Sequence, residues 1–117
     1  MVSSFELAGH VVGIMVDRDL TEEYLEEIHK IILEKIALHG KINLFCEIQK
    51  GQQVPFKILM KELKFKYENS KNLNKLAFIS DTSWMRTLMG INDLVLPCEV
   101  RTFDSTNRLD AINWISH

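Results

Sequence analysis

The sequence predicts a single α/β domain over residues 1–117, with a mostly parallel five-stranded sheet, an antiparallel hairpin for its first strand and about four helices. Short apolar runs alternate with longer stretches in which apolar residues recur every three or four positions, the pattern of strands followed by helices. Glycine, proline or capping residues separate most of these segments. A hydrophobic content of 46% is enough for one core that needs no disulfide or metal.

The first two strands are predicted at residues 5–7 and 11–16, which are apolar runs joined by a short connection. This connection contains Gly9 and His10. A glycine-containing connection of this length favours an antiparallel pair of strands.

The next segment is predicted to be a long amphipathic helix that ends at Gly40. Thr21 is placed to cap it, and Glu22 and Glu23 lie in its first turn, where the helix dipole favours negative charge. Its apolar positions form one stripe: Tyr24, Leu25, Ile28, Ile31, Ile32 and Ile36. Residues 42–48 are nearly continuously apolar, which predicts a central strand that pairs in parallel with 11–16.

A second amphipathic helix is predicted to begin at Pro55, since proline suits the first turn of a helix. Its apolar residues are expected to face the core: Phe56, Leu59, Met60, Leu63 and Tyr67. Lys57, Lys61 and Lys64 fall together on another face. The polar cluster at 69–74 ends the helix.

The last third of the chain repeats the strand-then-helix pattern twice. Strands are predicted at 76–79 and 99–103, and helices at 84–89 and from about Asn107 to Ile115. In the final helix, Leu109, Ile112 and Ile115 are expected to point inward, with Trp114 beside them.

Composition limits the function classes. The net charge of -2 weighs against a general nucleic-acid binder, although residues 17–27 are acidic and 50–75 are rich in lysine. The chain shows no signal-peptide pattern and no apolar stretch long enough to span a membrane. Cys46 and Cys98 lie in or beside apolar runs, which favours reduced thiols. We therefore expect a soluble, cytoplasmic protein.

Four sequence segments in order resemble a known family. They are L-T-E-E-Y, then G-K-I-N-L-F-C-E-I, then K-L-A-F-I-S-D followed by Ser83 and Trp84, and finally E-V-R-T-F-D-S-T-N-R-L-D-A-I-N-W-I. Together they resemble the SpoIIAA-like family, which is related in fold to STAS domains and is grouped by some with the CRAL-TRIO lipid-binding proteins. The resemblance implies a superhelix of strand and helix turns in which sequential strands are neighbours.

The resemblance does not extend to the phosphorylation switch of STAS anti-anti-sigma proteins. Those proteins carry a serine between the third strand and the second helix. Here that connection, 49–55, reads Q-K-G-Q-Q-V-P and contains no serine or threonine. No switch site is therefore transferred to this chain.

Two candidate sites lie where strands are followed by helices, the edge at which ligands of open α/β folds usually bind. Five carboxylates could gather there to hold a hard cation, or each could cap its own helix, which we favour: Asp17, Asp19, Glu47, Asp81 and Asp104. The second candidate is a ligand pocket formed by Asp81, Ser83, Trp84 and Arg86. Alternatively, Trp84 only anchors its short helix.

A third candidate is the lysine face Lys57, Lys61 and Lys64, which could bind an acidic partner or an anionic lipid surface. It could also be an ordinary solvated face, or could complement the acidic segment 17–27 of another copy. The histidines are scattered, and no catalytic or phosphate-binding motif occurs.

These observations predict a non-enzymatic SpoIIAA-like domain without metal or cofactor that acts by protein–protein interaction or self-association as a homodimer. The alternative is a small binding protein for an apolar or lipid-like ligand. It is motivated by the CRAL-TRIO relationship and by methionine and aromatic residues in the second and third helices: Phe56, Met60, Phe65, Tyr67, Met85 and Met89.

Overall fold

The computed structural model describes residues 3–49, 51–52, 54–81 and 98–117. The elements in order are β1 (Ser3–Ala8), β2 (Val11–Val16), α1 (Glu22–His39), β3 (Ile42–Ile48), α2 (Phe56–Glu68), the 3-10 turn η1 (Ser70–Asn72), β4 (Leu73–Ile79), β5 (Glu99–Phe103), the 3-10 turn η3 (Ser105–Asn107) and α4 (Arg108–Ile115). The helix predicted at 84–89 lies outside the described residues.

The strands form one sheet in the order β1-β2-β3-β4-β5. The four strands β2 to β5 are parallel, and β1 pairs antiparallel with β2 at the edge. The predicted α/β architecture with a mostly parallel sheet is confirmed, and β3 is its middle strand as expected. β4 begins at Leu73, three residues earlier than the apolar run suggests.

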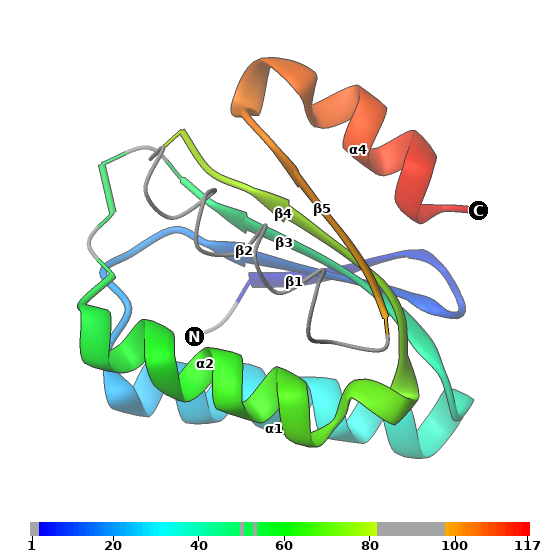
Figure 1. The fold of residues 1–117 in the computed structure, drawn as a ribbon, viewed down its shortest axis with the longest axis horizontal. Helices are drawn as coiled ribbons and strands as arrows, with labels where there is room; N and C mark the ends of the chain where they lie inside the picture. Colours follow the sequence, from blue (N-terminus) through cyan, green and yellow to red (C-terminus); the bar gives the residue numbers. More distant parts are fainter. Residues whose placement is uncertain (1–2, 50, 53, 82–97) are drawn as a thin grey trace.

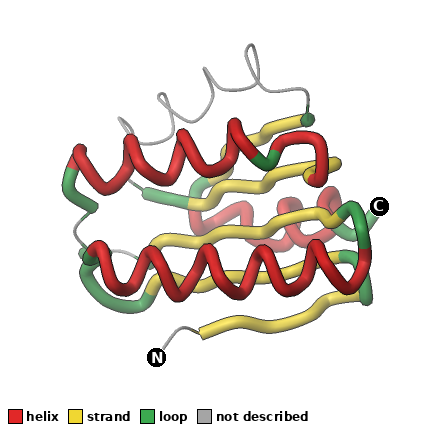
Figure 2. The backbone as a smooth tube through the Cα atoms, turned by 90° about the horizontal axis from the view of Figure 1, so that it is seen from below, coloured by secondary structure: helices red, strands yellow, loops and turns green. Residues whose placement is uncertain are grey.

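Helices cover both faces of the sheet. α1 and α2 lie side by side on one face and α4 lies on the other (Figures 1 and 2). Because side chains alternate along a strand, β3 sends Leu44 into the core under α1 and α2, and Phe45 into the smaller core under α4. Val11, Ala77 and Ile79 join Phe45 there.

The predicted ends and buried stripe of α1 are confirmed. The Thr21 hydroxyl accepts a hydrogen bond of 3.2 Å from the backbone N–H of Tyr24. Gly40 follows the helix with φ of 81°, a conformation that side-chain-bearing residues rarely adopt. Four residues of the stripe are buried: Tyr24, Leu25, Ile28 and Ile32.

The prediction that the apolar residues of α2 face the core is wrong for three of them. Phe56 is 64% exposed, and Met60 and Tyr67 are exposed as well. Ile58 and Glu62 are buried instead, because the helix is rotated to bring Glu62 against His29 of α1. Leu59 and Leu63 carry side chains that lie outside the described part.

The inward stripe of α4 also differs from the prediction. Leu109 is 79% exposed, whereas Ala111 and Ile115 are fully buried in the core under the helix. Two polar contacts fix this rotation: Arg108 reaches Glu47 on β3, and the buried Asn43 donates a hydrogen bond of 2.8 Å to the Ile115 carbonyl.

Candidate functional site

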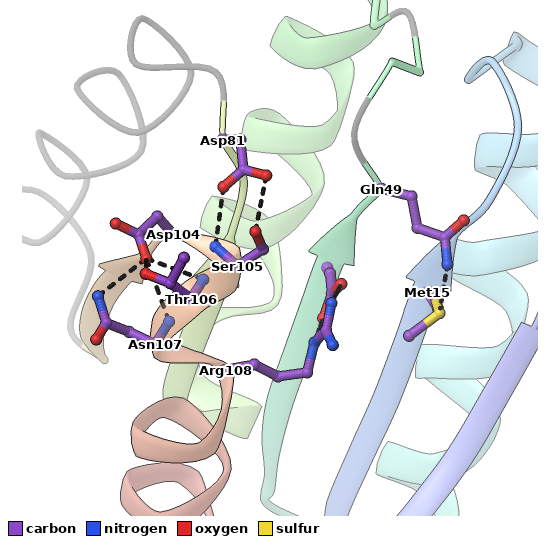
Figure 3. A network of polar contacts seen from close by, with 9 residues as sticks. Met15, Gln49, Asp81, Asp104, Ser105, Thr106, Asn107 and Arg108 are labelled. Carbon is purple, nitrogen blue, oxygen red and sulfur yellow. Dashed lines mark hydrogen bonds and ion pairs between the residues drawn. The ribbon is translucent and has the colours of Figure 1, made fainter.

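The carboxyl ends of the parallel strands carry the predicted carboxylates, and two of them, Asp81 and Asp104, bind the 3-10 turn η3 that precedes α4. Asp104 accepts hydrogen bonds from the backbone N–H groups of Thr106 (3.1 Å) and Asn107 (3.2 Å). Asp81, at the end of β4, accepts from the Ser105 backbone N–H (2.9 Å) and hydroxyl (2.8 Å). Figure 3 shows how these bonds join the ends of β4 and β5 to the turn before α4.

Glu47 is a buried charge held by Arg108. Its side chain is 2% exposed, and Arg108 Nε donates to Oε1 over 2.6 Å while Nη2 pairs with Oε2. This bidentate hydrogen bond is the largest reason why the pKa of Arg108 is raised. Figure 3 shows Arg108 extending from the start of α4 toward β3. The pair therefore fastens α4 to the centre of the sheet.

Asp17 is engaged at the end of β2. The Tyr24 hydroxyl lies 3.2 Å from Oδ1 of Asp17 and 3.3 Å from the Met15 carbonyl oxygen, and donates between these two acceptors. Burial raises the pKa of Tyr24 above the usual 10.0. The contact links the start of α1 to the end of β2.

The carboxylates at this edge thus have structural partners. Asp19 also interacts with a neighbour. Among the described residues, no three His, Cys, Asp or Glu side chains are grouped so that they could hold a metal ion. Of the predicted ligand pocket, Asp81 is bound to Ser105, and Ser83, Trp84 and Arg86 lie outside the described residues.

The outer surface of α1 and α2 carries exposed charged and apolar side chains close together. We define the α1–α2 face as the exposed, outward residues of the two helices: Glu23, Glu26, Lys30 and Leu33 of α1, and Phe56, Lys57, Met60 and Lys64 of α2. Of the three predicted lysines, Lys57 and Lys64 point outward, and Lys61 turns toward α1 and pairs with Glu22. Exposed apolar groups therefore lie beside exposed charges on this face.

A His–Glu pair, which the sequence did not suggest, holds the two helices together beneath this face. His29 Nε2 lies 2.6 Å from Glu62 Oε2, and the imidazole stacks on Phe65 with ring centroids 3.7 Å apart. The histidines looked scattered because no local spacing relates α1 to α2. Glu62 could have indicated such a pair, because it lies four residues after Ile58 and therefore on the same, buried side of α2. A buried carboxylate needs a partner.

Two cavities adjoin the helical layer of the described part. The enclosed apolar space between the sheet and the two helices measures about 20 Å³ and is bordered by Leu25, Cys46 and Phe78 among others. That is room for roughly one water molecule. A groove of about 510 Å³ lies along the outside of α1, bordered by His29, Leu33 and Ala37. In the same described part, no helix is both long and apolar enough to cross a bilayer.

Comparison with known proteins gives a family and a fold. The family model described as SpoIIAA-like matches residues 11–116. The structure is similar to that of an uncharacterized protein of the DUF3478 family with a SpoIIAA-like fold from Shewanella loihica PV-4. The two share 16% identity with a TM-score of 0.69, over 98% of this chain and 92% of that one. No curated protein matches the sequence.

Proposed function

This chain belongs to the SpoIIAA-like family, and from that premise we propose that it is a non-enzymatic binding domain whose α1–α2 face docks a protein partner or another copy of the chain. The observation that carries the proposal is the exposed apolar surface of α2. Phe56 and Met60 lie in solvent beside Lys57 and Lys64, although the helix has buried residues elsewhere to hold it on the sheet.

Exposed apolar groups next to charged ones are the composition of a protein interface. We propose the absence of a catalytic role because the carboxylates that the structure describes at the carboxyl edge are engaged in structural contacts. Glu47, Asp81 and Asp104 each hold a helix or turn in place, which leaves them engaged in structure rather than directed at a substrate.

A second candidate is an anionic lipid surface, and the same observation favours it. A helix with exposed Phe56 and Met60 flanked by lysines has the composition of an interfacial helix. The acidic first turns of α1 lie beside it and would be repelled by anionic headgroups, so we rank this candidate lower. Binding of a lipid between the sheet and the helices α1 and α2 has less support still, because the space of about 20 Å³ that the described residues leave there is far smaller than a lipid chain.

The test of the proposed function is sedimentation velocity of the wild-type chain and of a Phe56→Ser, Met60→Ser variant, from micromolar to millimolar concentration. We expect concentration-dependent association of the wild type and its loss in the variant, with an unchanged melting temperature. Co-sedimentation with anionic and with zwitterionic vesicles, at low and high salt, tests the lipid candidate. A wild-type chain that stays monomeric and binds neither vesicle would contradict both candidates.

A further inference from the structure

We propose that the occupant of the α1–α2 face is a second copy of this chain, docked with the acidic first turns of α1 from one copy on the lysines of α2 from the other, and the reverse. The inference rests on the proposed function, because it names the partner of the same face.

The relative positions of α1 and α2 along their axes determine which charges meet in this dimer. α1 connects β2 to β3 and α2 connects β3 to β4, and all three strands are parallel, so the two helices run in the same direction. The Lys61–Glu22 pair and the His29–Glu62 contact hold their N-terminal halves level. The acids at 22–27 therefore lie at about the same level along the helix axes as the lysines at 57–64. Figure 2 shows the two helices side by side.

Two orientations of a two-fold axis could bring the α1–α2 faces of two copies together, and they differ in which charges meet. A two-fold axis parallel to the helices and midway between them places α1 of one copy over α2 of the other without changing their heights, and each contact occurs twice. A two-fold axis across the helices places α1 on α1 and α2 on α2 in opposite directions, so an axis at the height of these charges would set acid against acid and lysine against lysine. Charge favours the first arrangement.

The charges that would meet are exposed in one copy. On α1 these are Glu23 and Glu26, and on α2 they are Lys57 and Lys64. In the next turn of α1, Lys30 and Glu34 balance one another, so the negative charge of the helix is concentrated in its first turns.

The area of the face predicts a weak dimer. α1 has 18 residues and is therefore about 27 Å long. Two adjacent helices are about 20 Å wide, which gives a footprint of about 500 Å² per copy and about 1,000 Å² in total. This is at the lower limit for a specific interface. Leu33 and Met60 supply exposed apolar contact within it.

A charge-swap experiment tests the arrangement. One variant carries Lys57→Glu and Lys64→Glu, so both helices present mainly negative charge. The other carries Glu23→Lys and Glu26→Lys, so both present mainly positive charge. We expect each variant alone to dimerise at least about tenfold more weakly than the wild type in sedimentation velocity at low salt. An equimolar mixture should recover dimerisation, because every contact in the heterodimer again joins opposite charges.

The matched control is Lys41→Glu with Glu99→Lys, which reverses the same kinds of charge at exposed positions outside the face. It should dimerise like the wild type, and circular dichroism checks that every variant is folded. A wild-type dimer that neither swap weakens, or a mixture that stays monomeric, would overturn the inference but leave self-association as the proposed function. A monomeric wild type would also overturn it, and the vesicle assay then decides separately whether the face binds anything.

Discussion

At the scale of single residues, loss of the Glu47–Arg108 pair should lower the free energy of unfolding more than loss of the surface pair between Arg18 and Asp17. Glu47 is buried in the middle strand, whereas Arg108 is 47% exposed at the start of α4. A carboxylate removed from water is stable only with a partner, so the arginine compensates for a charge that the sheet cannot solvate.

Arg108→Ala should therefore destabilise the domain more than its exposed position suggests. Breaking a buried pair costs about 3–5 kcal/mol, and water that reaches the half-exposed guanidinium reduces the expected loss to roughly 2–4 kcal/mol. Urea denaturation measures this loss. Replacing both partners, Glu47→Met with Arg108→Met, should cost less than Arg108→Ala, since no unpaired charge remains.

Arg18→Ala is the control for this measurement. Arg18 is exposed and pairs with Asp17 at the surface, so its removal should cost less than about 1 kcal/mol. Equal losses for the two arginine variants would show that Glu47 does not depend on Arg108.

Tyr24 gives a prediction in pH. Its pKa is raised in the folded protein, mainly by burial, above the value of 10.0 that the unfolded chain has. The unfolded state therefore loses the proton first as pH rises, and the free energy of unfolding falls from about pH 10 upward. Tyr24→Phe should reduce that slope relative to the wild type in denaturation at pH 9 to 11. Parallel curves for the two proteins would contradict a raised pKa.

At the scale of elements, the rotation of α2 separates its buried side from its binding side. Ile58 is buried in the core and Phe56 is exposed two residues earlier. The helix is therefore attached by one side, and the apolar groups on the other side are available to a partner.

A pair of alanine substitutions tests this division. Ile58→Ala removes buried methyl groups and should cost about 2–4 kcal/mol, whereas Phe56→Ala should change the free energy of unfolding by less than about 0.5 kcal/mol. Thermal or urea denaturation measures both. A larger loss for Phe56→Ala than for Ile58→Ala would place Phe56 in the core and remove the basis of the proposed function.

The elements differ in how well the sequence predicts them, and the reason is physical. α1 and β3 were predictable because a continuous apolar stripe, a capping threonine and a closing glycine all agree with the observed helix and strand. The rotations of α2 and α4 were not, because each is fixed by a polar contact between distant segments: Glu62 with His29, and Arg108 with Glu47. The spacing of apolar residues indicates which side of a helix is buried, but it gives no information about polar contacts between distant segments.

The same limit applies to the sites. The capping role predicted for the strand-end carboxylates holds for Asp104, which caps the turn that follows it. It does not hold for Glu47, which pairs with Arg108 of a distant helix. The α1–α2 face was predictable only in part. The lysines were visible in the sequence, but Met60 and Phe56 had to be seen in solvent before the face could be interpreted as a binding surface.

At the scale of the whole molecule, the outward face of the helical layer carries opposite charges on its two helices, while the net charge of the chain is only -2. The small net charge gives little overall repulsion between copies, and the opposite charges on the two helices would attract each other in the proposed dimer. The dimer should therefore depend on salt. Raising ionic strength from about 0.05 M to 0.5 M shortens the Debye length to a few ångström and should weaken dimerisation several-fold in sedimentation velocity. A dimer that high salt strengthens would have an apolar interface instead.

Self-association through the α1–α2 face is tested most directly by a series of amide NMR spectra of the wild-type chain at increasing concentration, at low salt. We expect concentration-dependent shifts and broadening to cluster in α1 over 22–34 and in α2 over 57–68, while α4 is unaffected. Shifts confined to α4 or to the β1 edge, or no shifts up to millimolar concentration, would contradict this expectation.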